Sequence, residues 1–379
     1  GDYLLEYFYG DDYIYSISID QADQYLLKRV ELNDKFSTQI TSFISMISST
    51  PNPNEMEDQL IQFKELSSYL YTKLLSEHLD DKNIERLNLI LDDLLTRIPF
   101  EVLIRSQEGR NFKELDYLIK ETSIQYLFTS NKQPFHETDI VNNDRILGLG
   151  YTSVDEGISQ DGLPGTEKEI QYLNANFSGE FYTGVGASRE LFLDKADQFE
   201  IIHLAIHGRA DEENRFQSRL IFNGDREDNM LYPGQLYLAN LKSRLAVLSA
   251  CESGVGTIQK GEGTFSIARG FAIVGIPNIV MSLWEVNDAI TSRQMVRFYN
   301  SHLQKGTPVN QALRKMKMDY LQNEDSYFCH PYYWSSFVHI STDLEEGKAK
   351  NYLAYVIFFV LAMLSMTVFL VLKKRKGIY

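Results

Sequence analysis

The hydrophobic pattern along residues 1–135 predicts a small α/β unit. Apolar and polar residues alternate on both sides of the turn Gly10-Asp11-Asp12, which is typical of two strands in a β-hairpin. Apolar residues then recur at helical spacing, and short apolar runs follow them. The expected order is strands at 3–9 and 13–19, helices at 34–48 and 55–79, a strand at 84–91, and a turn and strand at 98–104.

Residues 145–342 show a different pattern, in which uninterrupted apolar runs alternate with amphipathic segments. Strands are expected at 201–206, 245–250, 279–284 and 335–341, with helices at 264–273, 289–303 and 307–321. Strands that alternate with helices of this length favour right-handed crossovers and a mainly parallel sheet with helices on both faces. We therefore predict an α/β fold whose two parts join in the polar stretch 129–145.

A histidine and a cysteine each follow one of the apolar runs. His207 ends the run at 201–206, and Cys251 ends the run at 245–250, 251 − 207 = 44 residues later. Ligands and catalytic groups gather at the carboxyl ends of parallel strands. A thiol with a pKa of about 8.5 is mostly protonated at neutral pH, so an imidazole that takes its proton would create the nucleophile of a cysteine peptidase. His203 lies further from the strand end, so His207 is the better base.

The same segments offer donors for a tetrahedral intermediate. Gly208 has no Cβ to keep its N–H from a substrate, and the N–H of Cys251 leads into a glycine-rich turn, so these two groups are the expected oxyanion hole. The alternative is that Cys251 is a buried packing residue, as cysteines at the ends of core strands often are. The other cysteine, Cys329, is expected to be a packing residue or a bystander thiol, and we expect no metal site.

Six blocks of sequence, in this order, resemble the CHAT family of caspase-like peptidases, relatives of caspases and separase. The blocks are LPGTE at 163–167, HLAIHG at 203–208, LSACESG at 248–254, GEG at 261–263, SLWEVND at 282–288 and HPYYW at 330–334. The resemblance implies that His207 and Cys251 are the catalytic dyad and that no cofactor is needed. It also implies an inactive caspase-like half at 1–135 ahead of a catalytic caspase-like half at 145–342. Asn287 departs from the family, which usually has a second acidic residue there.

Asp288 has two interpretations. It follows the predicted strand at 279–284 and precedes the predicted helix at 289–303, so as an N-cap it would accept hydrogen bonds from the first N–H groups of that helix. Separase has a similar Trp-x-Val-x-Asp segment at the same distance from its nucleophile. That resemblance implies an acidic wall of the substrate pocket and cleavage after Arg or Lys. One aspartate can serve both roles.

Charge and hydropathy indicate the partners. The chain has 37 basic and 52 acidic residues, a net charge of −15, which argues against nucleic acid as a partner. Residues 352–372 carry no formal charge, and as a helix they would span about 31 Å, close to the hydrocarbon thickness of a bilayer. A linker at 343–351 precedes them and a basic tail at 373–379 follows. The sequence therefore predicts a single-pass membrane protein anchored in the bilayer through 352–372.

The orientation in the membrane has two solutions. Four basic residues follow the predicted span and two precede it, and the positive-inside rule then places the tail in the cytoplasm and the catalytic half outside. That orientation requires a signal peptide, which residues 1–379 lack, and they also lack an initiator methionine. A longer polypeptide would resolve this, and the family resemblance implies tetratricopeptide-type repeats ahead of residue 1. The other solution is a tail-anchored protein that faces the cytoplasm.

Together these patterns predict a membrane-anchored cysteine endopeptidase of the CHAT type that cleaves one or a few partner proteins in regulated proteolysis. Two alternatives stay open. One is a catalytically silent signalling scaffold that keeps the caspase-like fold, and the other is a cysteine-dependent amidase that acts on small molecules. The reactivity of Cys251 distinguishes the scaffold from the peptidase, because a buried structural thiol is inert.

Overall fold

The architecture follows from the order of helices and strands in two parts of the chain. The computed structural model describes residues 2–80, 82–129, 144–152, 164–209, 211, 217–223, 227–249, 265–284 and 288–342. Residues 2–129 are called the first half below, and residues 144–342 the second half. The described elements of the first half are β1 (Asp2–Tyr9), β2 (Tyr13–Ile19), β3 (Tyr25–Glu31), α1 (Asp34–Ser48), α2 (Met56–Leu74), α3 (Ser76–Leu79), β4 (Arg86–Ile90) and β5 (Ser123–Leu127).

Strands and helices alternate along the second half. Its described elements are β6 (Ile146–Gly150), α4 (Pro164–Asn176), β7 (Gly179–Thr183), α5 (Arg189–Lys195), β8 (Ile201–Ala205), β9 (His207–Arg209), β10 (Arg219–Ile221), β11 (Met230–Leu231), β12 (Leu245–Leu248), α6 (Phe265–Ile273), β13 (Asn278–Ser282), α7 (Asp288–Tyr299), α8 (Val309–Asn323), α9 (Pro331–Trp334) and β14 (Phe337–Ser341). The strands at 201–206, 245–250 and 279–284 predicted from the sequence correspond to β8, β12 and β13.

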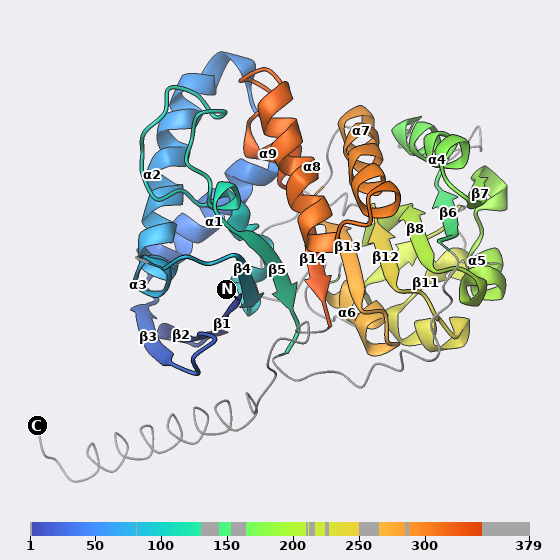
Figure 1. Ribbon diagram of the computed structural model, residues 1–379, viewed down its shortest axis with the longest axis horizontal. Coiled ribbons are helices and arrows are strands. Elements are labelled where there is room, and N and C mark those ends of the chain that lie inside the picture. The colour runs from blue at the N-terminus through green and yellow to red at the C-terminus, as the bar shows by residue number, and fades with distance from the viewer. Residues whose placement is uncertain are drawn as a thin grey trace, which may run out of the picture.

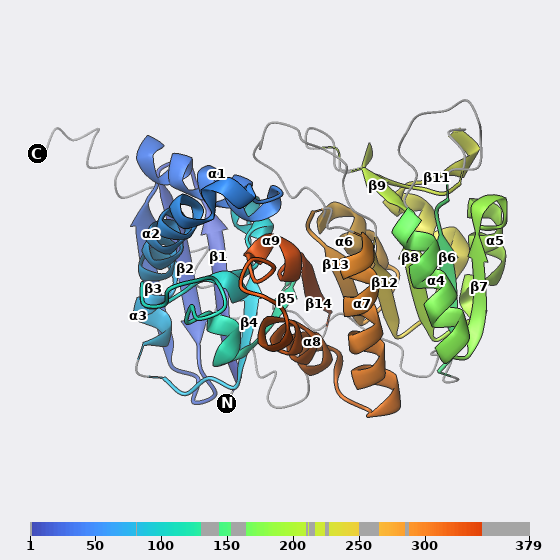
Figure 2. The ribbon, with the colours of Figure 1, turned by 90° about the horizontal axis from the view of Figure 1, so that it is seen from above.

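Eleven of the described strands form one sheet that runs through both halves. Their order is β3-β2-β1-β4-β5-β14-β13-β12-β8-β6-β7, and Figure 2 shows them side by side. The pairs β1–β2, β2–β3 and β13–β14 are antiparallel, and the remaining pairs in this sheet are parallel. The prediction of an α/β fold with a mainly parallel sheet is therefore confirmed.

β14 lies near the centre of the sheet although it follows all other described strands in the sequence. It pairs in parallel with β5 and antiparallel with β13. Because β13, β12, β8 and β6 are parallel to one another, they run opposite to β4 and β5. The carboxyl ends of these two sets of strands therefore lie on opposite sides of the sheet, at opposite ends of the strand direction. The strands β6, β8, β12 and β13 end at the side of the sheet where His207 lies, and β4, β5 and β14 end at the other side.

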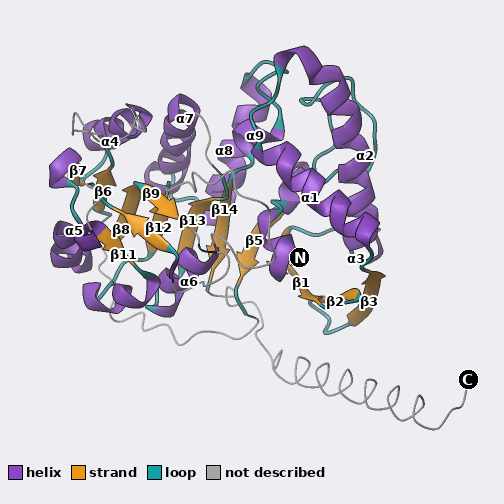
Figure 3. Ribbon diagram, turned by 180° about the vertical axis from the view of Figure 1, so that it is seen from behind, coloured by secondary structure: helices purple, strands orange, loops and turns teal. Residues whose placement is uncertain are grey.

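The period-two alternation of the strands divides the core of the second half into two layers. In β8, Ile201 and Ala205 pack in one hydrophobic cluster with residues of α4, α7 and α8. Ile202 and Leu204 point to the other face and share a cluster with residues of α5 and α6. Figure 1 shows α4, α7 and α8 on one side of the sheet and α6 on the other, and Figure 3 shows the same arrangement from behind.

A buried ion pair joins α8 to the first half. Lys317 Nζ lies 3.0 Å from Glu101 Oε1, and the two side chains are 1% and 4% exposed. Tyr126 of β5 donates its hydroxyl to the second carboxylate oxygen at 2.6 Å. Burial lowers the pKa of Lys317, and the attraction of Glu101 opposes that effect. The pair therefore fixes the position of α8 against the first half.

The segment 98–104 is not a strand, contrary to the sequence prediction. Phe100–Val102 forms a short 3₁₀-helix, and the N–H of Leu103 donates to the carbonyl of Phe100 at 3.1 Å. The N–H of Phe100 donates to the hydroxyl of Tyr126 at 2.8 Å. These groups are thus bonded within the turn and to a side chain, and they do not join the ladder of the sheet.

Several described elements are additional to the predicted ones, among them β5, β7, α4 and α5. The antiparallel edge strand β3 is additional to the predicted strands. Residues Gly148-Leu149-Gly150 lie within β6 and pair with both β7 and β8.

The predicted membrane segment, 352–372, lies outside the described residues, as do the linker at 343–351 and the tail at 373–379. In the part of the chain that the structure describes, no helix has both the length and the apolar character that a membrane span requires.

Candidate active site

His207 lies where the chain leaves the large sheet. It follows β8 by two residues and begins β9, which pairs antiparallel with β10 so that His207 stands opposite Ile221. Its imidazole is partly exposed and packs against the ring of Tyr151, with ring centroids 4.5 Å apart in an edge-to-face arrangement. Tyr151 follows β6 and donates its N–H to the carbonyl of Ala205 at 2.8 Å. The candidate base is therefore positioned by the ends of two neighbouring strands.

His203, the other histidine of this segment, is enclosed in the core. It is 0% exposed, and its Nδ1 lies 3.0 Å from the hydroxyl of Tyr299. Its Nε2 lies 3.1 Å from Oε1 of Glu169, whose side chain is 4% exposed. These two atoms are close, although their geometry is not that of an aligned hydrogen bond. Both ring nitrogens thus face buried groups, which leaves His207 as the histidine that a substrate can reach from this strand.

The register of β8 and β12 relates the two candidate dyad residues. Leu248, the last residue of β12, pairs with Leu204 of β8. Leu204 precedes His207 by three residues, and Leu248 precedes Cys251 by three. Cys251 itself lies outside the described residues, which reach Ser249 in this segment. The two adjacent parallel strands therefore direct the chain toward both candidate residues from the same edge of the sheet.

The other predicted site residues belong to neighbouring elements. Gly208 is buried in β9, opposite Leu220 of β10. Asp288 is the first residue of α7, so the helix begins one residue before the predicted start, and its side chain is outside the described part of the structure. The segments at 282–288 and 330–334 meet, because Trp284 donates its indole N–H to the carbonyl of Tyr332 at 3.0 Å.

Cys329 is a structural thiol. It is 0% exposed, and its Sγ lies 3.7 Å from the carbonyl oxygen of Leu321. Burial raises the pKa of this thiol to about 11. Because the thiolate is the reactive form, Cys329 is protonated and unreactive at neutral pH. The interpretation of Cys329 as a packing residue agrees with its position.

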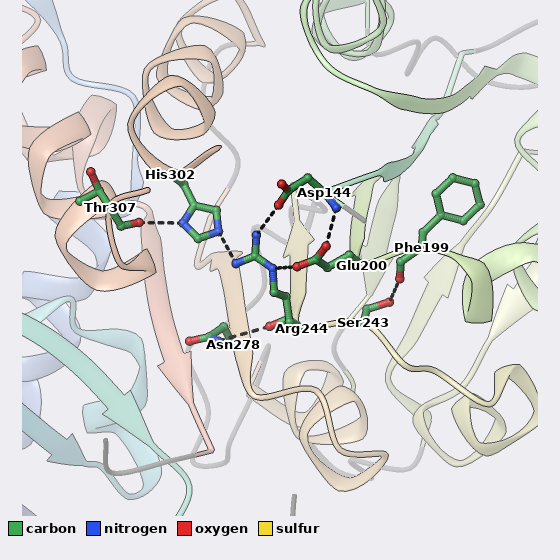
Figure 4. Close-up of polar contacts among 8 residues, drawn as sticks. All are labelled: Asp144, Phe199, Glu200, Ser243, Arg244, Asn278, His302 and Thr307. Atoms are coloured by element: carbon green, nitrogen blue, oxygen red, sulfur yellow. Dashed lines mark hydrogen bonds and ion pairs between the residues drawn. The ribbon is translucent and has the colours of Figure 1, made fainter. Parts of the chain in front are cut away.

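A separate polar cluster lies at the opposite side of the sheet, where β6, β8 and β12 begin. Arg244, just before β12, forms an ion pair with Glu200, just before β8. A second nitrogen of Arg244 lies 3.2 Å from the carboxylate of Asp144, and a third lies 3.2 Å from Nε2 of His302 (Figure 4). His302 uses Nδ1 to donate to the carbonyl of Thr307 at 2.8 Å. Burial lowers the pKa of His302, which keeps Nε2 available as an acceptor. This cluster fixes the starts of β6, β8 and β12.

Glu169 is the residue near the site that the sequence reasoning did not identify. It lies on α4 among the buried residues Thr166, Ile170 and Leu173, at the spacing of one helix face. An acidic residue on an otherwise buried face is unusual, since an unpaired buried charge is costly. An acidic residue at the helical spacing of otherwise buried positions was therefore the signal by which Glu169 could have been found in the sequence.

Comparison with known proteins identifies a matching family model and similar solved structures. A family model described as the CHAT domain matches residues 62–342. The comparison with curated proteins found no match. Two solved structures of the Saccharomyces cerevisiae separase–securin complex are similar, at 9% and 10% sequence identity and a TM-score of 0.48 each. Each match covers 90% of this chain and 30% of the matched chain, so this chain spans about a third of the length of the proteins it resembles.

Proposed function

The chain belongs to the CHAT domain family, and on this basis we propose that it is a cysteine endopeptidase in which His207 activates Cys251. The register that brings Leu204 and Leu248 side by side is the observation that carries the proposal. Each of these residues stands three positions before one member of the dyad. A base and a nucleophile at the ends of adjacent parallel strands are within reach of one peptide bond.

The chemistry requires two proton transfers and one covalent intermediate. His207 takes the thiol proton, and the thiolate of Cys251 attacks the carbonyl carbon of the scissile bond. The N–H groups of Gly208 and Cys251 stabilise the oxyanion. As the C–N bond breaks, the imidazolium gives its proton to the leaving amine. A water molecule, deprotonated by His207, then hydrolyses the thioester, which releases the carboxylic acid and regenerates the thiol.

The substrate is one or a few partner proteins, and the pocket favours cleavage after Arg or Lys. Asp288 is the residue proposed for this preference, since a carboxylate beside the residue that precedes the scissile bond attracts a basic side chain. The first residue of α7 is also a position where a carboxylate is stabilised by the positive end of the helix. Tetratricopeptide-type repeats ahead of residue 1 are part of the proposal as a means of recognising the partner.

Cleavage of a peptide library tests the proposed function. The full chain is expected to cleave after Arg or Lys, Cys251→Ala is expected to abolish cleavage, and Asp288→Ala is expected to reduce the Arg/Lys preference about tenfold or more. Cys329→Ala is the matched control and is expected to leave the cleavage pattern unchanged, because its buried thiol is unreactive. Cleavage after another residue type would remove the role of Asp288 and keep the dyad. Cleavage by Cys251→Ala would overturn the proposed mechanism.

Membrane anchoring through residues 352–372 is also a proposal, supported by the length and apolar character of that segment. The positive-inside rule favours an extracytoplasmic catalytic half. The full chain is expected to stay with membranes after alkaline carbonate washing, whereas a chain that ends at Thr342 is expected in the supernatant. Equal release of both chains would contradict the anchor. Protease accessibility of the second half in sealed vesicles reports the orientation.

A further inference from the structure

We propose that Glu169 is a positioning residue of the active site, whose buried carboxylate fixes the carboxyl ends of β8 and β12 relative to each other. This inference rests on the proposed function, because the groups held in place are the catalytic His207 and Cys251. Glu169 does not reach a substrate from its buried position, so its role is exerted through the two strands.

The contacts of Glu169 connect both strands. One carboxylate oxygen, Oε1, lies 3.1 Å from Nε2 of His203 in β8. The other oxygen, Oε2, accepts a hydrogen bond from the hydroxyl of Ser249 at 3.4 Å. Ser249 directly follows β12 and precedes Cys251 by two residues, while His203 precedes His207 by four. One side chain thus contacts the chain just ahead of both members of the dyad.

His203 is held on its other side by Tyr299. The Tyr299 hydroxyl lies 3.0 Å from Nδ1, and burial, reinforced by the charge of Glu169, raises the pKa of this phenol well above 10. Tyr299 therefore stays protonated and can donate to Nδ1, while Nε2 of His203 faces Glu169. This arrangement gives every member of the row Tyr299–His203–Glu169–Ser249 a polar neighbour.

Gly150 in β6 allows α4 to bring Glu169 this close to the sheet, and Gly148 leaves room for the ring of Phe181 in β7. Gly148 pairs with His203, and Gly150 pairs with Ala205. A Cβ on Gly150 would lie 2.7 Å from a side-chain carbon of Ile170, and a Cβ on Gly148 would lie 2.5 Å from the ring of Phe181. There is accordingly no room for a side chain at either position. The close contact of α4 with β6 and the position of Glu169 depend on each other.

Burial of the Glu169 carboxylate lowers the stability of the fold. Glu169 is 3% exposed and His203 is 0% exposed, and burying a charged group costs stability unless it is paired well. Their contact is close but imperfectly aligned, so it does not offset that cost fully. We attribute the presence of a carboxylate at this buried position to the geometry that Glu169 imposes on the ends of β8 and β12.

The pH dependence of Cys251 alkylation tests the inference. The full chain is treated with iodoacetamide from pH 5 to 10, and modification of Cys251 is followed by mass spectrometry. The wild-type thiol is expected to titrate below about 8.5 because the imidazolium of His207 stabilises its thiolate. Glu169→Gln displaces the strand ends and is expected to raise this apparent pKa toward about 8.5 and to lower the alkylation rate at pH 7 about tenfold. Glu167→Gln makes the same change at an exposed position of α4 and is expected to alter neither value.

Ser249→Ala provides a second variant if Glu169→Gln lowers the midpoint of thermal unfolding strongly. It removes only the contact between Glu169 and the residue after β12, and it is expected to raise the pKa of Cys251 in the same direction. Combined with Glu169→Gln, it is expected to add little, because both changes remove one interaction.

Two outcomes would overturn the inference and can be told apart. If wild-type Cys251 titrates well below 8.5 and neither Glu169→Gln nor Ser249→Ala shifts it, Glu169 has no positioning role and the peptidase proposal stands. If wild-type Cys251 itself reacts as an ordinary thiol with a pKa of about 8.5, the proposed function fails and the positioning role fails with it.

Discussion

Replacing His207 with alanine is expected to lower the rate of peptide cleavage at least about a thousandfold, because the step that creates the thiolate and the step that protonates the leaving amine both lose their proton carrier. The KM is expected to change little, since the imidazole acts on the reacting bond and not on the binding of the peptide. Steady-state kinetics with the preferred peptide from the library measures both constants.

The same substitution changes the titration of Cys251. Without the imidazolium, the thiolate loses its stabilising neighbour, so the alkylation profile of Cys251 in His207→Ala is expected to move up to about 8.5. Cys329 serves as an internal reference in the same samples, because its burial and its pKa of about 11 do not depend on His207.

Arg209→Ala is the matched control for His207→Ala. Arg209 lies two residues further along β9 and is exposed, so its removal changes the charge of this strand and not the dyad. Cleavage by Arg209→Ala at close to the wild-type rate is expected. A His207→Ala variant that retained more than about a tenth of the wild-type kcat would show that another group takes the thiol proton.

Replacing Glu101 with alanine is expected to reduce the free energy of unfolding by about 3–5 kcal/mol, because it leaves the buried ammonium of Lys317 without its counter-charge. Tyr126 also loses the acceptor of its hydroxyl. The measurement is urea-induced unfolding of the full chain, followed through the signals of Trp284 and Trp334. The loss is large relative to the usual stability of a domain.

A double substitution separates the charge effect from the loss of packing. Glu101→Leu combined with Lys317→Met removes both buried charges and keeps apolar volume at both positions. We expect the double variant to be markedly more stable than Glu101→Ala. Apolar residues can often replace both members of a buried ion pair, whereas removal of one member leaves the other charge buried and unpaired. A double variant as unstable as Glu101→Ala would show that the pair matters for reasons other than charge.

Asp319→Asn is the control on the same helix. Asp319 pairs with Lys315 at 2.9 Å on the surface of α8, where the two side chains are 34% and 47% exposed. A solvated pair at this spacing contributes little, so the expected change is below about 0.5 kcal/mol.

The strands β8, β12, β13 and β14 and the helices α6, α7 and α8 were predictable because their signals are local. Apolar runs at 201–206 and 245–250 became β8 and β12, and the helical pattern at 307–321 became α8. The proline and glycine residues between them mark the boundaries without help from tertiary contacts. The hairpin of β1 and β2 was predictable for the same reason.

The joining of both halves in one sheet was not predictable from such local signals. Pairing of β14 with β5 brings Ile340 beside Tyr126, more than two hundred residues earlier, and no period or turn residue encodes that partner. The segment at 98–104 has an apolar composition that suits a strand, yet the N–H of Phe100 donates to Tyr126. In these cases a tertiary contact overrides the local preference.

The candidate site divides in a similar way. The sequence places His207 and the residues leading to Cys251 after apolar runs, and ligands and catalytic groups gather at the carboxyl ends of parallel strands. Glu169 could not be assigned in the same way, because its contacts with His203 and Ser249 depend on how closely α4 approaches β6. That approach depends on the absence of a side chain at Gly150, and the contact of Gly150 with Ile170 of α4 has no signature in sequence periodicity.

The position of β14 also determines when the large sheet can be completed during synthesis of the chain. A ribosome delivers β5 and β13 long before Phe337, so each of these strands waits with one unpaired edge until the strand between them emerges. Pairings of such long sequence separation also form slowly. The nascent chain therefore has its second half beside an unpaired strand until translation has passed residue 341. Under the proposed function, this order postpones peptidase activity until synthesis of the sheet is finished.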